Sequence, residues 1–164
     1  MSDLARCLPA VTHPMHIVAI DRDGVNANGD ADFVDVTSSE IAFTTLAQDP
    51  LSNITSPRTV AVKDAAAWAS LWAEHAGTSR PLPQVDFQRN MVLAVFRGTQ
   101  PGGCYPTTIT SVARSASKIS VLHADSVPGP LVFCTHVVTA PSHMVLVERS
   151  DLPVEFATER TVAE

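Results

Sequence analysis

Residues 64–77, with the sequence DAAAWASLWAEHAG, decide the fold. Asp64 is suited to cap a helix, because its carboxylate can accept hydrogen bonds from the free amides of the first turn. The alanines that follow are strong helix formers, and Gly77 is typical of the left-handed residue that ends a helix. Large side chains three or four positions apart share one helical face. They are Trp68, Leu71, Trp72 and His75. The stretch therefore predicts one amphipathic helix.

Short apolar or alternating runs surround this helix. Residues 91–96 are apolar at every position, which is typical of a central strand covered on both faces. The other predicted strands are His16–Ile20, Ile41–Leu46, Arg58–Lys63, Thr107–Ala113, Lys118–Ala124, Leu131–Thr139, Met144–Glu148 and Val154–Phe156. One helix followed by closely spaced strands predicts an α+β fold, in which a mainly antiparallel sheet carries the helix on one face.

The composition indicates a folded domain and argues against several classes of protein. Of the 164 residues, 45% are hydrophobic and 17% are charged, which is enough apolar material for a core. No apolar run approaches the roughly 18 residues that a membrane span needs. The net charge of −6 is concentrated at the start, because residues 1–40 carry seven acids and two bases. No basic stripe is present, so nucleic-acid binding is not expected.

Much of this acidity lies in a polar run at Asp21–Asp32, which predicts a long acidic loop or hairpin. The run does not fit an EF-hand: with Gly29 at position six, positions one and twelve fall on Gly24 and Asp35. A weak, irregular calcium site is the alternative. Its candidate ligands are Asp21, Asp23, Asp30 and Asp32.

Several segments occur in an order and spacing similar to those of a known family. They are residues 68–75 (WASLWAEH), 83–87 (PQVDF), 91–98 (MVLAVFRG), 102–105 (GGCY), 139–141 (TAP) and 144–147 (MVLV). Over residues 41–158 the chain resembles the PrcB C-terminal-like domain family, named for a bacterial protein that stabilises a secreted protease complex. The sequence departs from the pattern at Ser142-His143, where an aromatic residue after the proline is more usual.

The resemblance implies a domain at residues 41–158, preceded by an acidic segment at 1–40 and followed by a tail at 159–164. It implies a non-catalytic binding domain that stabilises or modulates another protein, such as a secreted protease, without a cofactor. It also implies a periplasmic or extracellular location. Met1–Leu8 lacks the pattern of a signal peptide, which leaves the cytoplasm as the alternative. A different class of function also stays open, a small-ligand or calcium-binding protein that uses the acidic loop.

Cys104 and Cys134 are the cysteines of interest. If the domain is exported, a disulfide between them is expected, and Cys7 is then left over. In a reducing compartment they would be two buried thiols. A further alternative is a zinc site in which these cysteines are joined by His123 and His136, although the spacing matches no zinc finger.

The segment Gly98–Tyr105 predicts an exposed turn rich in glycine and proline, and such loops on rigid strands are common binding surfaces. The candidate binding residues are Gly98, Gly102, Gly103 and Tyr105. The helix tryptophans could instead form a binding platform, but their spacing favours packing against the sheet. No nucleophile motif marks a serine or cysteine, so an enzyme is not predicted.

Overall fold

The computed structural model describes residues 38–163, within one compact unit that spans Val36–Glu164. The elements of this part of the chain are β1 (Ser39–Glu40), β2 (Thr44–Asp49), β3 (Arg58–Val62), α1 (Ala65–Ala76), β4 (Asn90–Phe96), β5 (Thr107–Arg114), β6 (Ile119–Pro128), β7 (Ser142–Glu148) and β8 (Val154–Ala163). The predicted strand His16–Ile20 and the acidic run Asp21–Asp32 lie outside the described residues.

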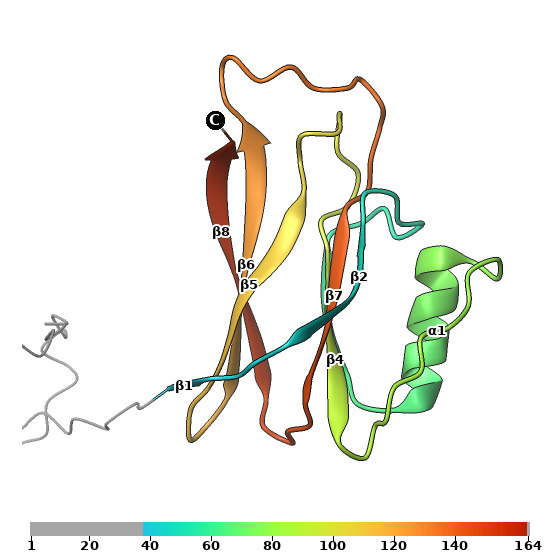
Figure 1. Ribbon diagram of the computed structural model, residues 1–164, viewed down its shortest axis with the longest axis vertical. Coiled ribbons are helices and arrows are strands. Elements are labelled where there is room, and N and C mark those ends of the chain that lie inside the picture. The colour runs from blue at the N-terminus through green and yellow to red at the C-terminus, as the bar shows by residue number, and fades with distance from the viewer. Residues whose placement is uncertain (1–37, 164) are drawn as a thin grey trace, which may run out of the picture. The chain divides into compact units, whose positions relative to one another are not determined.

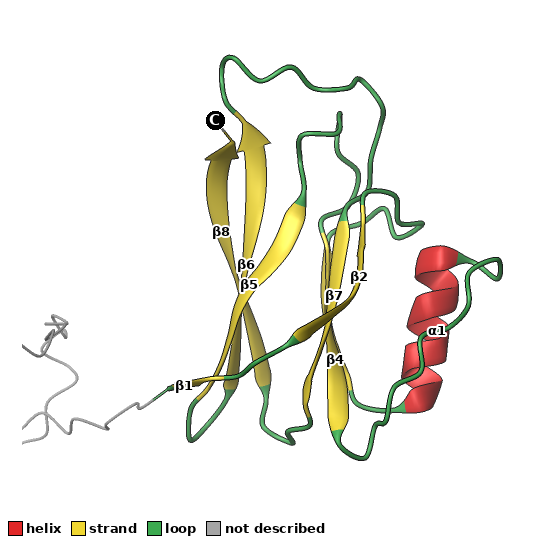
Figure 2. Ribbon diagram, viewed as in Figure 1, coloured by secondary structure: helices red, strands yellow, loops and turns green. Residues whose placement is uncertain are grey.

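The strands form two four-stranded sheets, with the orders β1-β5-β6-β8 and β2-β7-β4-β3. The two sheets face each other, and α1 covers the outer face of the second sheet (Figures 1 and 2). All strand pairs are antiparallel except β6 and β8, which run parallel. The predicted α+β fold with a mainly antiparallel sheet is therefore confirmed, with the difference that the strands divide between two sheets.

Strand β4 lies at the centre of this arrangement, as its apolar sequence predicts. Met91, Leu93 and Val95 point between the two sheets and pack with side chains from β5, β6 and β7. Val92, Ala94 and Phe96 point the other way, into the core beneath α1. Because side chains alternate along a strand, a run that is apolar at every position is what two separate cores require.

Helix α1 is capped as the sequence predicts. The Asp64 carboxylate accepts a hydrogen bond of 2.8 Å from the Ala67 amide, and Gly77 has the left-handed φ of 68° after the last turn. Trp68 and Trp72 are buried against the sheet. Their indole N–H groups donate to the carbonyls of Pro83 and Arg80. The tryptophans thus serve the core rather than an exposed platform.

Several predicted strand bounds differ from the structure. β2 begins at Thr44, because Ile41 donates its amide to Val112 of β5 instead. β8 is much longer than the predicted Val154–Phe156, since β6 offers it a parallel partner along its whole length. The described residues contain no helix with the length and apolar character needed to cross a membrane.

The predicted strand at Leu131–Thr139 is wrong. Residues 132–138 have no regular secondary structure and form the connection between β6 and β7 (Figure 1). Both edges of β6 are occupied, by β5 and by β8, and Pro128 and Pro130 flank the exit from β6. The segment therefore has no free strand of the sheet to pair with, and without that pairing its alternate apolar side chains are not directed into the core.

Candidate functional site

Two loops meet at one end of the domain and form the candidate site. The glycine loop is Gly98–Tyr105, between β4 and β5, and the apolar loop is residues 129–138, between β6 and β7. At the base of the glycine loop, Gln100 and Thr139 exchange two backbone hydrogen bonds of 2.7 and 3.0 Å. The Thr139 hydroxyl also donates to the Gly102 carbonyl at 2.9 Å. The apolar loop is thus anchored where it returns to β7.

A disulfide joins the two loops. Cys104 of the glycine loop is bonded to Cys134 of the apolar loop, with their Cα atoms 5.4 Å apart. The Gly103 amide donates to the Thr135 carbonyl at 3.2 Å beside this bond. The disulfide predicted for an exported domain is confirmed. It ties the middle of the apolar loop to the sheet framework, where strand pairing provides no support.

The candidate glycines fall into two groups. Gly98 has a φ of 76°, and a Cβ there would lie 2.7 Å from the Pro57 ring. Gly102 is buried, and a Cβ there would lie 2.7 Å from the Thr135 carbonyl oxygen. Both glycines allow close backbone approach. Gly103 is exposed and is the glycine of this loop that a partner could reach most directly.

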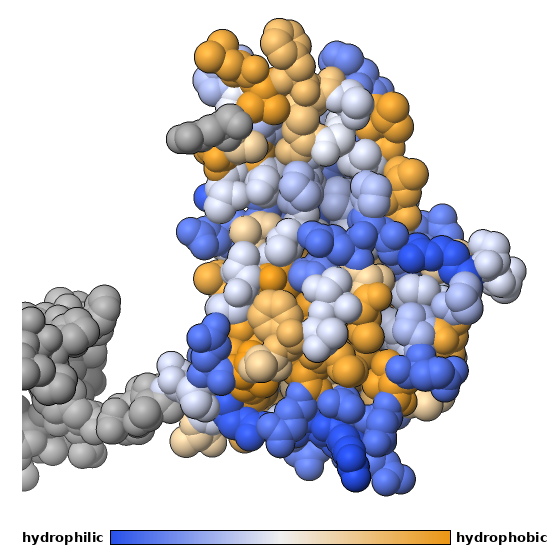
Figure 3. Space-filling view, in the orientation of Figure 1, coloured by the Kyte–Doolittle hydropathy of each residue, from blue (hydrophilic) through white to orange (hydrophobic). Residues whose placement is uncertain are grey.

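The apolar loop carries the largest exposed hydrophobic side chains at this end of the domain. Leu131 is 90% exposed, Phe133 is 101% exposed, and Val137 and Val138 are each above 60%. Figure 3 shows hydrophobic residues gathered along the top of the domain, over this loop. The surface of a monomeric protein rarely exposes several large apolar side chains in one patch. Such a patch indicates a contact site, and here a disulfide holds it in place.

A pocket lies beside the glycine loop. It has a volume of about 190 Å³ and lies between the ends of β2, β5 and β7 and the glycine loop. Its lining residues are Gln48, Asp49, Pro50, Gly103, Pro106, Thr107, Thr139, Pro141 and Ser142. The pocket is small and lies where the glycine loop meets the residues that follow the apolar loop, Thr139 and Pro141.

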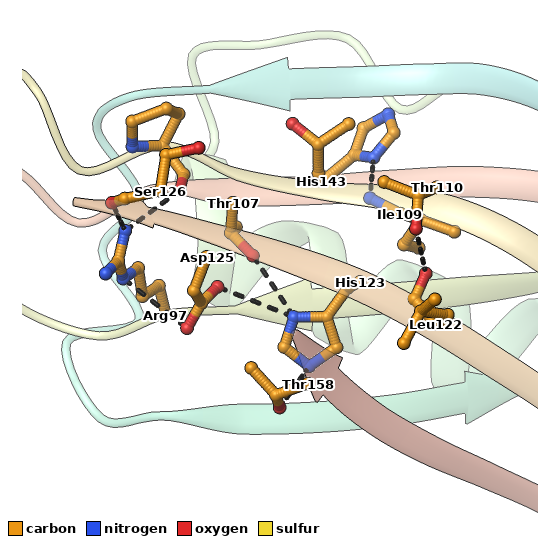
Figure 4. Close-up of polar contacts among 12 residues, drawn as sticks. Arg97, Thr107, Ile109, Thr110, Leu122, His123, Asp125, Ser126, His143 and Thr158 are labelled. Carbon is orange, nitrogen blue, oxygen red and sulfur yellow. Dashed lines mark hydrogen bonds and ion pairs between the residues drawn. The ribbon is translucent and has the colours of Figure 1, made fainter. Parts of the chain in front are cut away.

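Tyr105 lies deeper than a tip residue. Its half-buried ring is stacked near the Arg97 guanidinium, whose carbon is 5.5 Å from the ring centroid. Figure 4 shows that Arg97 also donates to the Ser126 carbonyl, at 2.6 Å, and faces Asp125. Arg97 donates in addition to the Pro106 carbonyl at 2.9 Å. These bonds connect the glycine loop to β6 of the other sheet.

His143 connects the two sheets at a point that sequence reasoning passed over. Its Nδ1 accepts the Ile109 amide of β5 at 2.8 Å (Figure 4), while its Nε2 is 3.0 Å from the Thr45 hydroxyl. The Ile109 amide lies where the β5–β6 register shifts, so His143 provides an acceptor at an irregular position. Burial lowers the pKa of His143, and the accepting Nδ1 requires the neutral ring.

A second buried histidine lies in an arrangement with the order of a Ser-His-Asp triad. His75 Nδ1 is 2.8 Å from the Ser52 hydroxyl, and its Nε2 is 3.1 Å from Asp49. Burial lowers the pKa of His75, and Asp49 acts against that effect. A serine hydrolase has the same three residue types, but its histidine meets the serine through Nε2 and the aspartate through Nδ1, the reverse of the arrangement here. Spacing in the sequence did not single out this cluster.

The surroundings of this triad-like cluster favour a structural role. Ser52 is 8% exposed, and His75 is 1% exposed. The Ser52 oxygen also accepts from the Ile54 amide, and Asp49 is shared with Arg80 at 3.0 Å. The cluster ties the end of β2 to the last turn of α1, since the Asn53 amide also donates to the His75 carbonyl.

The metal sites considered from sequence have separate outcomes. The zinc alternative with His123 and His136 is wrong, because the disulfide occupies both of its cysteines. Among residues 38–163, no group of three or more histidine, cysteine, aspartate or glutamate side chains is placed to hold a metal ion. The candidate calcium ligands lie outside the described residues. They are Asp21, Asp23, Asp30 and Asp32.

The comparison with known families agrees with the predicted resemblance. Residues 91–148 match the PrcB C-terminal family. The matched segment runs from β4 to the end of β7 and includes both loops and both cysteines of the disulfide. No curated protein and no solved structure matches the chain significantly.

Sequence reasoning found one half of the candidate site. It selected the glycine loop and both cysteines, but it assigned Leu131–Thr139 to a strand and so missed the exposed residues of the apolar loop. Pro128-Gly129-Pro130, which interrupts the strand pattern just before this segment, was the available signal.

Proposed function

We propose that this is a non-catalytic binding domain that associates with and stabilises another protein, and that the partner is a secreted protease complex. The observation that carries the proposal is the apolar loop, which holds Leu131 and Phe133 in solvent by means of a disulfide. A partner that covers these side chains would bury apolar surface at about 25 cal/mol per Å². The family name agrees with association with a protease complex.

The disulfide supports a periplasmic or extracellular location. Such bonds form and persist in oxidising compartments and are rare in the reducing cytosol. In an exported domain this disulfide would also be useful structurally, because the bond anchors a segment that has no strand partner. The localisation test is fractionation of cells that produce the full-length protein, followed by thiol labelling of Cys104 and Cys134 without reduction. Free thiols at both positions in the native compartment would contradict the proposed location.

The binding proposal is tested by placing a photo-crosslinking amino acid at position 133 and illuminating the domain in the native secreted fraction. We expect one dominant crosslinked product, which mass spectrometry identifies as a protease or a subunit of its complex. The same crosslinker at position 82 is the control, because Leu82 is an exposed leucine in the connector between α1 and β4. Equal products from both positions would contradict a specific site at the apolar loop.

A matched pair of variants measures the contribution of the loop. Leu131→Ser combined with Phe133→Ser should reduce capture of the crosslinked partner at least about tenfold, since exposed apolar anchors dominate many interfaces. Leu82→Ser should leave capture unchanged. The partner's activity should also decay faster when the domain is absent or carries the double substitution. Full stabilisation by the double variant would overturn the proposed use of this loop.

The absence of catalysis is part of the proposal, and the triad-like cluster makes it testable. The domain should not hydrolyse generic ester or peptide substrates above the rate of a Ser52→Ala variant. Activity that depends on Ser52 and on His75 would replace the binding proposal with a hydrolase.

A further inference from the structure

A charged cleft opens on the side of the domain where the last strands of the two sheets lie. β8 ends one sheet and β3 ends the other, and a cleft of about 430 Å³ lies between them. Further along these two strands, Ala61 of β3 and Val154 and Phe156 of β8 are partly buried and pack against the core between the sheets. The residues that line the cleft include Thr59, Arg97, His123, Asp125, Thr158 and Arg160.

Positive charge exceeds negative charge among the groups that face this cleft. Arg97 is paired with Asp125, at 3.5 Å between Nε and Oδ2. Arg160 makes no ion pair within residues 38–163. Burial lowers the pKa of Arg97; Asp125 opposes this effect, and the like charge of Arg160 adds to it. Arg58 also lines the cleft, but its guanidinium is paired with Glu74 at 2.8 Å. The guanidinium groups of Arg97 and Arg160 with the one carboxylate of Asp125 leave a net attraction for an anion.

The residues of β8 alternate between the cleft and solvent. The Thr158 hydroxyl is 2.9 Å from His123 Nε2, inside the cleft (Figure 4). Arg160 is two positions further along the strand and so shares the face of Thr158. The lining of the cleft includes both residues. Arg160 is therefore presented at the mouth of the cleft by a rigid strand.

Within residues 38–163, one edge of the β8 backbone is left unpaired along the same cleft. β8 pairs with β6 in one unbroken register from Val154 to Ala163, and no other described strand pairs with it. Its sequence contains neither a proline nor a register shift that would block a further strand. Long vacant edges of this kind accept an extended peptide through main-chain hydrogen bonds, while side-chain pockets select the sequence.

We propose that the β8 edge binds an extended peptide segment of a partner and that an aspartate or glutamate of this segment pairs with Arg160 in the cleft. Side chains directly opposite each other on neighbouring strands have Cβ atoms about 5 Å apart and point to the same face. A carboxylate opposite Arg160 thus reaches its guanidinium. Bidentate pairing between these two groups is a strong charge-assisted contact. The end of β8 touches the start of the apolar loop, where the Gly129 amide donates to the Ala163 carbonyl at 3.0 Å. The proposed peptide site uses none of the exposed side chains of that loop and does not depend on the function proposed for it.

The test is selection from a displayed library of random ten-residue peptides against the oxidised full-length chain. We expect enriched peptides to carry an aspartate or glutamate at one fixed position. In NMR spectra, a selected peptide should shift the amides of residues 158–162. Replacing its acid by the amide analogue should weaken binding about tenfold, and Arg160→Gln in the protein should weaken it by the same factor. The control is Arg89→Gln, at an 86% exposed arginine that precedes β4.

Each other outcome overturns the proposal. A library without acidic enrichment, or peptides that bind Arg160→Gln equally well, would remove the charge contact. Glutarate that shifts the same amides as strongly as the peptide would show a site for small free acids. Concentration-dependent dimerisation through β8 would show that a second copy occupies the edge. The Leu131→Ser, Phe133→Ser double variant should bind the peptide normally, so failure of the apolar-loop proposal is distinguished from failure of this one.

Discussion

The core beneath α1 and the apolar loop use similar side chains in opposite ways. Trp68 and Trp72 are 2% and 5% exposed, whereas Leu131 and Phe133 are 90% and 101% exposed. α1 satisfies its own backbone hydrogen bonds and can lay one face on a sheet. The apolar loop has no strand partner and relies on a disulfide and a few bonds to the glycine loop. The difference shows that backbone pairing, rather than hydrophobicity, decides which apolar side chains are buried here.

The largest expected effect separates the two regions directly. Trp68→Ala should lower the free energy of unfolding by about 3–5 kcal/mol, because it leaves a large cavity between helix and sheet. Phe133→Ala should change it by no more than about 0.5 kcal/mol, since its ring is already in solvent. Urea unfolding followed by circular dichroism measures both. Similar losses for the two variants would mean that the apolar loop belongs to the core.

The disulfide supplies the next largest effect. Replacing Cys104 and Cys134 by serine should lower the free energy of unfolding by about 3–4 kcal/mol, as expected for a loop closed over 30 residues. Hydrogen exchange should accelerate first at the amides of Gly103 and Thr139, while α1 keeps its protection. Reduction of the unsubstituted protein is the control and should reproduce both changes. Uniform loss of protection would show that the bond supports the whole domain rather than the loops.

Within the glycine loop, the stability of variants at Gly98 and Gly103 distinguishes a residue that supports the fold from one that is exposed for contact. Gly98→Ala should cost about 2 kcal/mol or more, because φ is 76° and a Cβ would meet Pro57 and the Thr55 carbonyl. Gly103→Ala should cost less, since the nearest atom to its Cβ is the rotatable Thr135 hydroxyl. Thermal unfolding of the pair measures the difference. Equal losses would assign Gly103 to the framework as well.

The most gradual effect is a dependence of stability on pH. Burial lowers the pKa of both His75 and His143 in the folded protein, so the unfolded chain binds more protons as the pH falls below about 6.5. Stability should therefore be full above that pH and decrease on acidification until the folded-state pKa values are reached. His143→Gln, which retains hydrogen-bonding capacity, should flatten this dependence. Urea midpoints between pH 7.5 and 5 measure it, and midpoints that rise on acidification would contradict it.

Local sequence signals were sufficient to predict an element where that segment forms its own backbone hydrogen bonds. Asp64, the alanines and Gly77 specify the helix through contacts that are local in the sequence, and the unbroken apolar run at 91–96 indicates a strand between two cores. The strand at Leu131–Thr139 was mispredicted because a strand also needs a vacant neighbour, and both edges of β6 are taken. The same non-local pairing extends β8 beyond its predicted three residues.

The candidate sites depend more strongly on tertiary structure. The two cysteines can be picked out from the sequence. Only the folded structure shows that their disulfide joins the two loops and so holds Leu131 and Phe133 in solvent. Asp49, Ser52 and His75 gather around the end of α1 from positions that no motif links. Arg97 and Arg160 come from different sheets and face one cleft only because the two sheets lie against each other.

The sequence by itself determined the helix, the doubly covered central strand and the class of fold, because periodicity and capping act between residues close along the chain. Tertiary structure alone decided that the strands divide into two sheets, that the apolar segment after β6 stays exposed, and that one edge of β8 has no partner among the described strands. Those outcomes depend on which strands find partners, and pairing between distant segments leaves no mark at a fixed spacing in the sequence.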